Sequence, residues 1–379
     1  MGKVYLPHAE QFDEMNETLA RIANAISADI DVSTWSGIQR AVRVGIAPSI
    51  IPVGTQLIVK HAVYGDMLYD VVAHNHFKSE HDKNAHTMTL MCHGILPTSI
   101  QYDALEAFYY ADVALPAGDY SFTLSSTYLS LAAGTYYFTL TKTLPVGGQL
   151  CIVDMTSGGN AAMTDRRVYT YPNNGDSGEG CNIALGARGT SLGTFGQELN
   201  HIHRVYHGSN NYKESAIRQF LNSSAEEGSV WAPQTKFDRP PSWSTTVKGF
   251  MNGLDEELIN VIGKVVVPCS ANDTYESPDS TTKKGMKYEV VDRIFLASQQ
   301  EVLGISTNII SDDSVLLQFF EDSADTDRIK YKGGTAVPWA TRSVQALNAD
   351  VCRIISPTGT TGSYYTNVTE SCVPVFNIV

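Results

Sequence analysis

Residues 332–343 have the sequence KGGTAVPWATRS, and this stretch organises the last third of the chain. A Gly-Gly pair and a proline lead to Trp339, and Arg342 follows three residues later. Glycine and proline punctuate local structure, so the pattern predicts a turn followed by a strand with a large aromatic anchor. We expect Trp339 and Arg342 to form the core and scaffold of this region.

The chain closes with residues 372–379, CVPVFNIV, which are almost entirely apolar. Chain ends usually fray unless they join a sheet, so this end predicts a buried closing strand. Between the two stretches the chain is rich in Gly, Ser, Thr, Asn and Tyr, residue types that suit adaptable recognition surfaces. We therefore expect the intervening segment to contact a ligand, and the candidate residues are Asn348, Thr358, Thr360, Ser363, Tyr364, Tyr365 and Asn367.

Length and composition narrow the classes of protein. A chain of 379 residues with 43% hydrophobic and 18% charged residues is typical of a globular protein with two or three domains. The formal net charge of -13 argues against nucleic-acid binding, because a surface that follows phosphates needs an excess of Lys and Arg. The six cysteines form no CxxC pair, which favours free buried thiols over a metal knuckle.

The first residues predict an amphipathic helix. Apolar residues recur there at gaps of 3, 4, 3 and 4, the spacing of a coiled coil, and they are Phe12, Met15, Leu19, Ile22 and Ile26. Two interpretations stay open at this point. The helix packs against its own chain, or it forms a short parallel bundle that makes a homotrimer, with support from the domains downstream because two heptads alone are marginal in water.

Neither secretion by a signal peptide nor membrane insertion is expected. Residues 1–7, MGKVYLP, lack a basic n-region and an apolar h-region. No run approaches the roughly 18 apolar residues that a spanning helix needs. If the protein acts outside a cell, it leaves by another route, and release within a virus particle is one such route.

Residues 53–154 predict an antiparallel β-domain. The segments 55–64 and 67–73 are strand-like and flank Gly65-Asp66, a hairpin signal. Residues 115–124, LPAGDYSFTL, then match residues 131–140, LAAGTYYFTL. Aromatic residues alternate in both copies and so share one strand face. A small sandwich or jelly-roll-like module is the economical interpretation.

Histidines in this domain invite a metal-site hypothesis. They are accompanied by Glu80 and Asp82, and they are His74, His76, His81 and His86. Imidazole and carboxylate ligands suit Zn or Fe, but a polar hairpin loop explains the pattern more simply. A second His-x-His, at His201 and His203, is better explained by structural hydrogen bonding. We expect no metal and no other cofactor.

Searches for catalytic patterns favour a protein that is not an enzyme. The chain has no Gly-x-Ser-x-Gly elbow and no His-Glu-x-x-His helix. The glycine-rich residues 186–193 lack the Lys-Ser/Thr of a phosphate-binding loop. Neighbouring carboxylates such as Asp255 and Glu256 are more typical of a solvated face than of an acid-base pair.

Four motifs in order carry a family resemblance. They are RQFLNS at 218–223, KFDRPP at 236–241, RIFLAS at 293–298, and Trp339 followed by Arg342 and Ser343. Over roughly residues 155–379 the chain resembles DUF6273, a family common in phages and prophages of gut bacteria. The family is similar to C-type-lectin-like folds of the formylglycine-generating-enzyme type. Phage tropism determinants carry that fold on a similar three-part plan.

The residue patterns and the resemblance together predict an α+β chain in three parts: a coiled-coil helix and connector at 1–52, the β-sandwich or jelly-roll-like domain at 53–154, and, from the resemblance, a C-type-lectin-like domain at 155–379. The copper chemistry of the oxidases with this fold is not expected, because it needs a close cysteine pair and Cys352 and Cys372 are far apart.

The same resemblance implies a protein of the virion. We expect a trimeric receptor-binding or tail-fibre protein that contacts other virion proteins through its N-terminus and a host-surface ligand through its C-terminal domain. The alternative is a capsid-decorating, head-fibre or baseplate protein.

Overall fold

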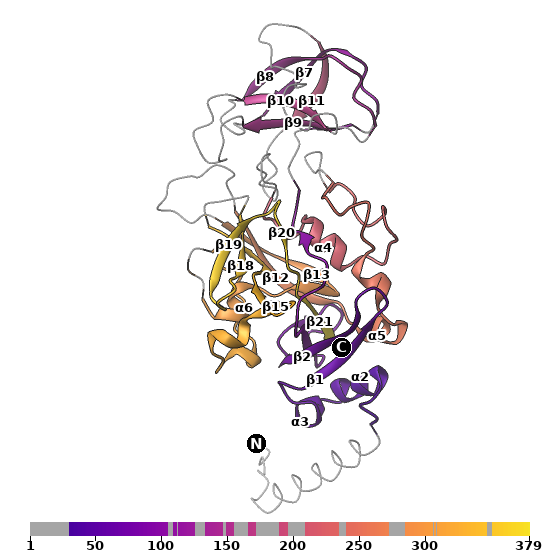
Figure 1. Ribbon diagram of the computed structural model, residues 1–379, viewed down its shortest axis with the longest axis vertical. Coiled ribbons are helices and arrows are strands. Elements are labelled where there is room, and N and C mark those ends of the chain that lie inside the picture. Colours follow the sequence, from indigo (N-terminus) through magenta and orange to yellow (C-terminus); the bar gives the residue numbers. More distant parts are fainter. Residues whose placement is uncertain are drawn as a thin grey trace, which may run out of the picture.

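The computed structural model describes residues 30–104, 109–111, 113–125, 133–146, 149–154, 166–171, 189–195, 209–234, 240–272, 285–305, 307, 309–346 and 351–379. The described chain has few, short helices and many antiparallel sheets, which is consistent with an α+β or mostly-β fold (Figure 1). The residues expected to form a coiled coil, Phe12, Met15, Leu19, Ile22 and Ile26, lie outside the described residues. No described helix is long and apolar enough to cross a membrane.

A five-stranded antiparallel sheet lies at the centre of the larger body. Its strand order is β1-β2-β4-β21-β14. The bounds are Gln56–His61 for β1, Gly65–His74 for β2, Met88–Cys92 for β4, Pro374–Ile378 for β21 and Ile294–Leu296 for β14. Every residue of β4, β21 and β14 is buried, as expected for strands covered on both faces. The apolar C-terminal stretch is therefore a closing strand, as its sequence predicted.

Two further three-stranded sheets complete this body. One has the order β13-β12-β3, formed by Gly285–Asp292, Val265–Asn272 and Lys78–Ser79. The other has the order β17-β18-β19, formed by Trp339–Val344, Val351–Ile355 and Thr361–Tyr365. Two strand pairs flank them, β15 (Lys330–Lys332) with β16 (Thr335–Val337) and β5 (Ile100–Gln101) with β20 (Thr369–Glu370).

Short helices cover the sheets. The N-cap side chains of Thr34, Ser215 and Ser298 accept backbone N–H groups at the starts of α2, α4 and α6, which satisfies donors that a helix leaves unpaired. The α-helices are α2 (Trp35–Arg43), α3 (Ala47–Ile50), α4 (Ala216–Leu221), α5 (Glu256–Val261) and α6 (Gln299–Leu303), and the 3₁₀ helices are η1 (Phe250–Gly253), η2 (Gln318–Phe320) and η3 (Asp325–Arg328).

The remaining strands form two three-stranded sheets that lie together at one end of the molecule in Figure 1. One has the order β10-β9-β6, formed by Arg166–Tyr171, Gln149–Asp154 and Tyr109–Tyr110. The other has the order β11-β7-β8, formed by Thr190–Phe195, Gly118–Leu124 and Gly134–Leu140. The two repeat copies pair with each other as β7 and β8, and β11 joins β7 in parallel.

The hydrophobic core follows a different division from the one that the sequence predicted. One cluster of buried apolar residues extends from Ile30 to Tyr102 and then from Tyr212 to Ile378. The two stretches meet directly, because the Ser209 N–H donates to Asp103 Oδ2 at 3.2 Å. Described core residues from both of the expected domains, 53–154 and 155–379, therefore belong to one cluster. The strands at 109–195 are an insertion between two stretches of one body. These two stretches pack together over a long sequence distance, which local sequence patterns do not reveal.

Candidate functional site

The family-like motifs meet in space. Asn222, at the end of α4, accepts the backbone N–H groups of Arg293 and Ile294 through Oδ1, at 3.0 and 3.2 Å. Its Nδ2 donates to the Ile294 carbonyl at 2.8 Å. Arg218, one turn earlier, donates hydrogen bonds from Nε and Nη2 to the carboxylate of buried Asp292. The first motif thus fixes the start of β14, where the third motif begins.

Arg342, from the fourth motif, reaches the same region from β17. It is fully buried, and it donates to the carbonyls of Pro268 and Leu296, both Glu301 carboxylate oxygens and Ser314 Oγ. A guanidinium has five N–H donors, and all five are used here. Asp312 lies further away, with Oδ2 3.7 Å from Nη2.

Glu301 is the counter-ion that makes this burial tolerable. Burial acts to raise the pKa of the Glu301 carboxyl, but the Arg342 guanidinium outweighs it, and the pKa lies below its usual value. Glu301 also closes a capping box with Ser298 at the start of α6. One buried ion pair therefore joins β17, β14 and α6, and removing either partner would leave an uncompensated buried charge.

Trp339 completes the frame. Its side chain is fully buried, and its Nε1 donates to the Arg328 carbonyl at 3.0 Å. Trp339 and Arg342 are thus core residues, which confirms what their sequence context predicted. Most of the described polar groups of these motifs are paired with backbone or with side chains of the same body, so the motifs mainly build a frame. Gln219 Nε2 and the side chain of Arg293 have no partner among the described residues.

The frame carries the β18–β19 hairpin, where most of the predicted ligand-binding residues lie. The side chains of Thr358, Thr360, Ser363 and Tyr364 are exposed, whereas Tyr365 and Asn367 are half-buried. Asn348 lies outside the described residues. β19 is an edge strand of its sheet among the described residues. Ser363 and Tyr364 are neighbours on it and point to opposite faces, and Thr358 and Thr360 lie in the loop before it.

The loop that joins the two strands is held by hydroxyl contacts. Ser356 Oγ lies 2.9 Å from both Thr358 Oγ1 and Thr360 Oγ1, which lie 3.1 Å from each other. Gly359 has a φ of +79°, and a Cβ added there would lie 1.8 Å from the Asp325 carbonyl oxygen. Only glycine fits this position, so the loop holds the hydroxyl cluster in one arrangement.

A cation without an acidic partner lies beneath the hairpin. Arg353, on β18, is 7% exposed. It donates to Gln299 Oε1 at 3.2 Å, to Gln345 Oε1 at 3.3 Å and to Ser363 Oγ, but forms no ion pair with the described residues. Burial lowers the pKa of the guanidinium, and no neighbouring carboxylate opposes the shift. Thr361 Oγ1 donates to the same Gln299 oxygen at 2.8 Å.

Gln299 itself is incompletely satisfied. The side chain is fully buried, and its Nε2 has no hydrogen-bond partner in the described structure. An unpaired buried donor beside an uncompensated guanidinium is costly, and such groups are common at functional sites. Neither Arg353 nor Gln299 was among the predicted residues. Arg353 lacks an acidic partner and Gln299 Nε2 lacks an acceptor among the described residues only because of how the chain folds. No spacing in the sequence could have predicted this.

A buried carboxylate lies near the same sheet. Glu370, on β20, is 4% exposed and makes no hydrogen bond with the described residues through its side chain. Burial raises the pKa of the Glu370 carboxyl to about 7. Its protonation therefore changes near neutral pH.

The histidines that suggested a metal site have separate partners. His74 Nε2 lies 3.0 Å from the Ile51 carbonyl, and His86 Nδ1 lies 3.1 Å from Asn75 Oδ1. His76 Nε2 lies 4.0 Å from Glu301. Among the described residues, no group of three or more His, Cys, Asp or Glu side chains is placed to hold a metal ion. His201 and His203 lie outside them.

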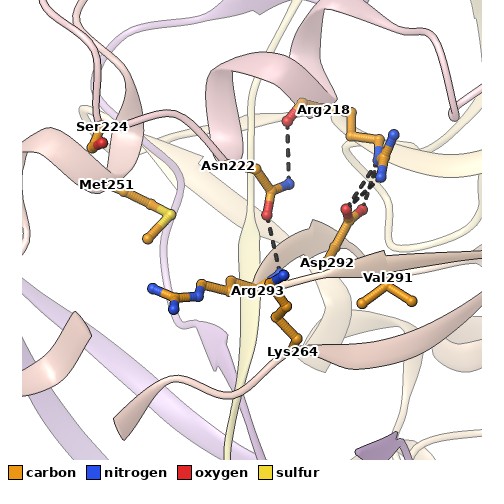
Figure 2. A pocket seen from close by; sticks show the side chains of 8 residues that line it. All are labelled: Arg218, Asn222, Ser224, Met251, Lys264, Val291, Asp292 and Arg293. Carbon is orange, nitrogen blue, oxygen red and sulfur yellow. Dashed lines mark hydrogen bonds and ion pairs between the residues drawn. The ribbon is translucent and has the colours of Figure 1, made fainter. Parts of the chain in front are cut away.

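A cavity of about 350 Å³ opens beside the first and third motifs (Figure 2). Three cationic side chains and one carboxylate are among the residues that line it, and the full set is Arg218, Asn222, Ser224, Met251, Lys264, Val291, Asp292 and Arg293. A smaller cavity of about 170 Å³ lies beside His76 and Glu301. Of its lining residues, only Arg218, Asn222 and Arg293 belong to the sequence motifs, and these motifs did not indicate a cavity.

Comparison with known proteins relates the second half of the chain to a family. Residues 190–378 match the family model described as "Domain of unknown function (DUF6273)". No curated protein and no solved structure matches the chain. The match spans the motifs at Arg218, Arg293 and Trp339. It covers just under half of the chain and supports a relation of residues 190–378 to the DUF6273 family.

Proposed function

We propose that this chain is a structural protein of a bacteriophage particle and that it binds the host surface through the β18–β19 hairpin. The observation that carries the proposal is the pair of exposed hydroxyl side chains, Thr361 and Ser363, above Arg353, a nearly buried cation without an acidic partner among the described residues. Tyr364 is exposed on the other face of the same strand. A rigid frame beneath an adaptable polar face suits recognition, because little conformational entropy is lost on binding.

The rest of the proposal follows the family resemblance. The C-terminal domain acts as a C-type-lectin-like module, and the N-terminal helix forms a homotrimer that contacts other virion proteins. Three copies of the hairpin on one particle protein raise the effective affinity for a repetitive cell surface.

Binding to cells tests the proposal with a matched pair of tyrosines. Tyr364, on the hairpin, is 42% exposed, and Tyr331, on the β15–β16 hairpin, is 57% exposed. Labelled wild-type protein and the Tyr364→Ala and Tyr331→Ala variants are titrated against a panel of bacterial cells. We expect Tyr364→Ala to weaken binding by about tenfold or more, as for a central aromatic contact, and Tyr331→Ala to leave it unchanged.

Equal binding by wild type and Tyr364→Ala would remove the hairpin from the proposal. Variants Thr361→Ala and Ser363→Ala extend the test, since both side chains also contact the groups beneath. Their loss should weaken binding without unfolding the protein, because both side chains are exposed. Circular dichroism checks the fold of each variant.

One observation favours the alternative, a capsid-decorating, head-fibre or baseplate protein that contacts other virion proteins. Ile58 on β1 and Leu68 on β2 are paired across the strands and are 57% and 43% exposed. Since β1 is the edge strand of the central sheet, a neighbouring protein could pair with its backbone and also cover this apolar pair. Labelled antibody on intact particles separates the functions: tail-tip labelling supports adsorption, and a regular pattern over the capsid supports decoration.

A further inference from the structure

The cavity beside β13 and α4 is unusual in charge. Arg218, Lys264 and Arg293 line it together with a single carboxylate, Asp292, so its lining carries a net charge of about +2 in a chain whose formal net charge is -13. An excess of positive charge in one hollow of an acidic protein concentrates anions there.

One of the three cations is already neutralised. Arg218 binds Asp292 through three hydrogen bonds of 2.7 to 3.0 Å, and Asp292 is 3% exposed. Burial raises the pKa of the Asp292 carboxyl, and the Arg218 guanidinium opposes this shift. This pair forms one wall of the cavity and has little capacity left for a ligand.

Arg293 is not neutralised. Its backbone N–H donates to Asn222 Oδ1, but its side chain forms no hydrogen bond or ion pair with the described residues, although it is half-buried. Figure 2 shows its guanidinium turned away from Asp292 and toward Met251. Partly burying a guanidinium without a partner costs free energy, so the position is better explained if an anion completes it.

Lys264 supplies the second available cation. Its Nζ forms an ion pair with Glu80 Oε2 at 3.9 Å, which is too long for a hydrogen bond, and its side chain is 51% exposed. Glu80 is not among the residues that line the cavity. A fork-shaped guanidinium and an ammonium together match an oxyanion with several acceptor oxygens.

We propose that this cavity binds the phosphate group of a small phosphorylated molecule. A phosphomonoester carries a charge of about -1.5 to -2 at neutral pH, which balances the excess charge of the lining. Ser224 lines the cavity as a further hydroxyl donor, and Met251 and Val291 supply an apolar wall for the carbon skeleton. A volume of about 350 Å³ lies within the range of small-molecule sites. This site is formed by other residues than the β18–β19 hairpin and does not depend on the proposed host binding.

Isothermal titration of the full chain tests the proposal with three probes: inorganic phosphate, glucose 6-phosphate and glucose. We expect both phosphates to bind and glucose to give no heat. Arg293→Gln should weaken phosphate binding by at least about tenfold, the loss expected for one charge-assisted contact. Arg43→Gln, which removes an exposed arginine of α2 outside the cavity, should bind like the wild type.

Stability measurements keep the outcome interpretable. Because Arg293 has no side-chain partner among the described residues, Arg293→Gln should fold with a melting temperature close to that of the wild type. Phosphate should raise the melting temperature of the wild type and not that of the variant.

The relative affinities of the probes identify the source of the phosphate group. Tighter binding of glucose 6-phosphate than of inorganic phosphate indicates a phosphorylated sugar, and equal affinities indicate recognition of the phosphate group alone. Absence of binding by both phosphates up to about 10 mM, or equal affinity in Arg293→Gln and the wild type, overturns the proposal.

Discussion

Arg342 and Glu301 show how single residues hold distant segments together. Their ion pair is fully buried, and Arg342 also donates to the carbonyls of Pro268, within β12, and Leu296, at the end of β14. A buried pair of this kind contributes little net stability compared with apolar residues, but breaking it is costly because the remaining charge stays buried.

Replacing Arg342 should therefore destabilise the fold strongly. We expect Arg342→Met to lower the free energy of unfolding by about 3 to 5 kcal/mol. Arg342→Lys keeps the charge but offers three donors instead of five, so its loss should be smaller. Urea unfolding followed by circular dichroism measures both, with Arg43→Gln as control. A stability of Arg342→Met equal to that of the wild type would show that the ion pair does not organise this core.

Glu370 should make stability depend on pH. The pKa of its carboxyl is about 7 in the folded protein and 4.5 in its unperturbed state, so the folded protein holds the proton more tightly. The stabilising contribution of the neutral carboxyl is fully present below pH 4.5 and is lost as pH rises through about 7.

The Glu370→Gln variant isolates this effect. The variant should not lose stability as pH rises. Its free energy of unfolding minus that of the wild type should be up to about 3 kcal/mol larger at pH 8 than at pH 4. Urea unfolding of both proteins across this pH range gives the comparison. Parallel pH profiles of wild type and variant would contradict the assignment to Glu370.

At the level of elements, the β18–β19 loop depends on Gly359. Gly359→Ala should destabilise the protein by about 1 to 3 kcal/mol and displace the hydroxyl cluster, because of the clash with the Asp325 carbonyl and the positive φ. Gly333→Ala is a matched control, since Gly333 also has a positive φ, +56°, but nothing lies within 4 Å of its added Cβ. Thermal unfolding compares the two, and equal losses would show that the backbone conformation alone, without the clash, sets the cost.

Helices and strands that have a local periodicity or repeat could be predicted from the sequence. The distant strands with which they pair could not. Trp339 and Arg342 were expected to form a core, and both are fully buried. The repeat at 115–140 became the β7–β8 hairpin, because its two copies are neighbours in the chain. The closing strand β21 was also predicted, but its pairing with β4 was not, because strand pairing over long distances has no sequence period.

For the candidate site, the sequence predicted the exposed residues of the hairpin and not the groups beneath them. Thr358, Thr360, Ser363 and Tyr364 are exposed, as a segment rich in hydroxyls suggests. Arg353 is notable only because three-dimensional packing brings no described carboxylate to it.

At the level of the whole molecule, the inserted sheets should be separable from the body. Asp103 and Ser209 are in hydrogen-bond contact, so a short Gly-Ser linker can replace residues 105–208 without moving either end. We expect this deletion variant to unfold cooperatively in urea, with the body intact. Deleting residues 30–92 instead should prevent folding, because β21 then loses its neighbour β4. If the first variant fails to fold and the second folds, residues 105–208 are part of the main body and residues 30–92 are not, contrary to the division inferred from the core.

The pairing of β4 with β21 also sets a schedule for biosynthesis. Thr89 and Asn377, whose side chains bond across these strands, are 288 residues apart. At a translation rate of about 5 to 20 residues per second, roughly 15 to 60 seconds separate their emergence from the ribosome. During that interval the edge of β4 that later pairs with β21 is unpaired, so slower translation lengthens the time in which nascent chains can aggregate.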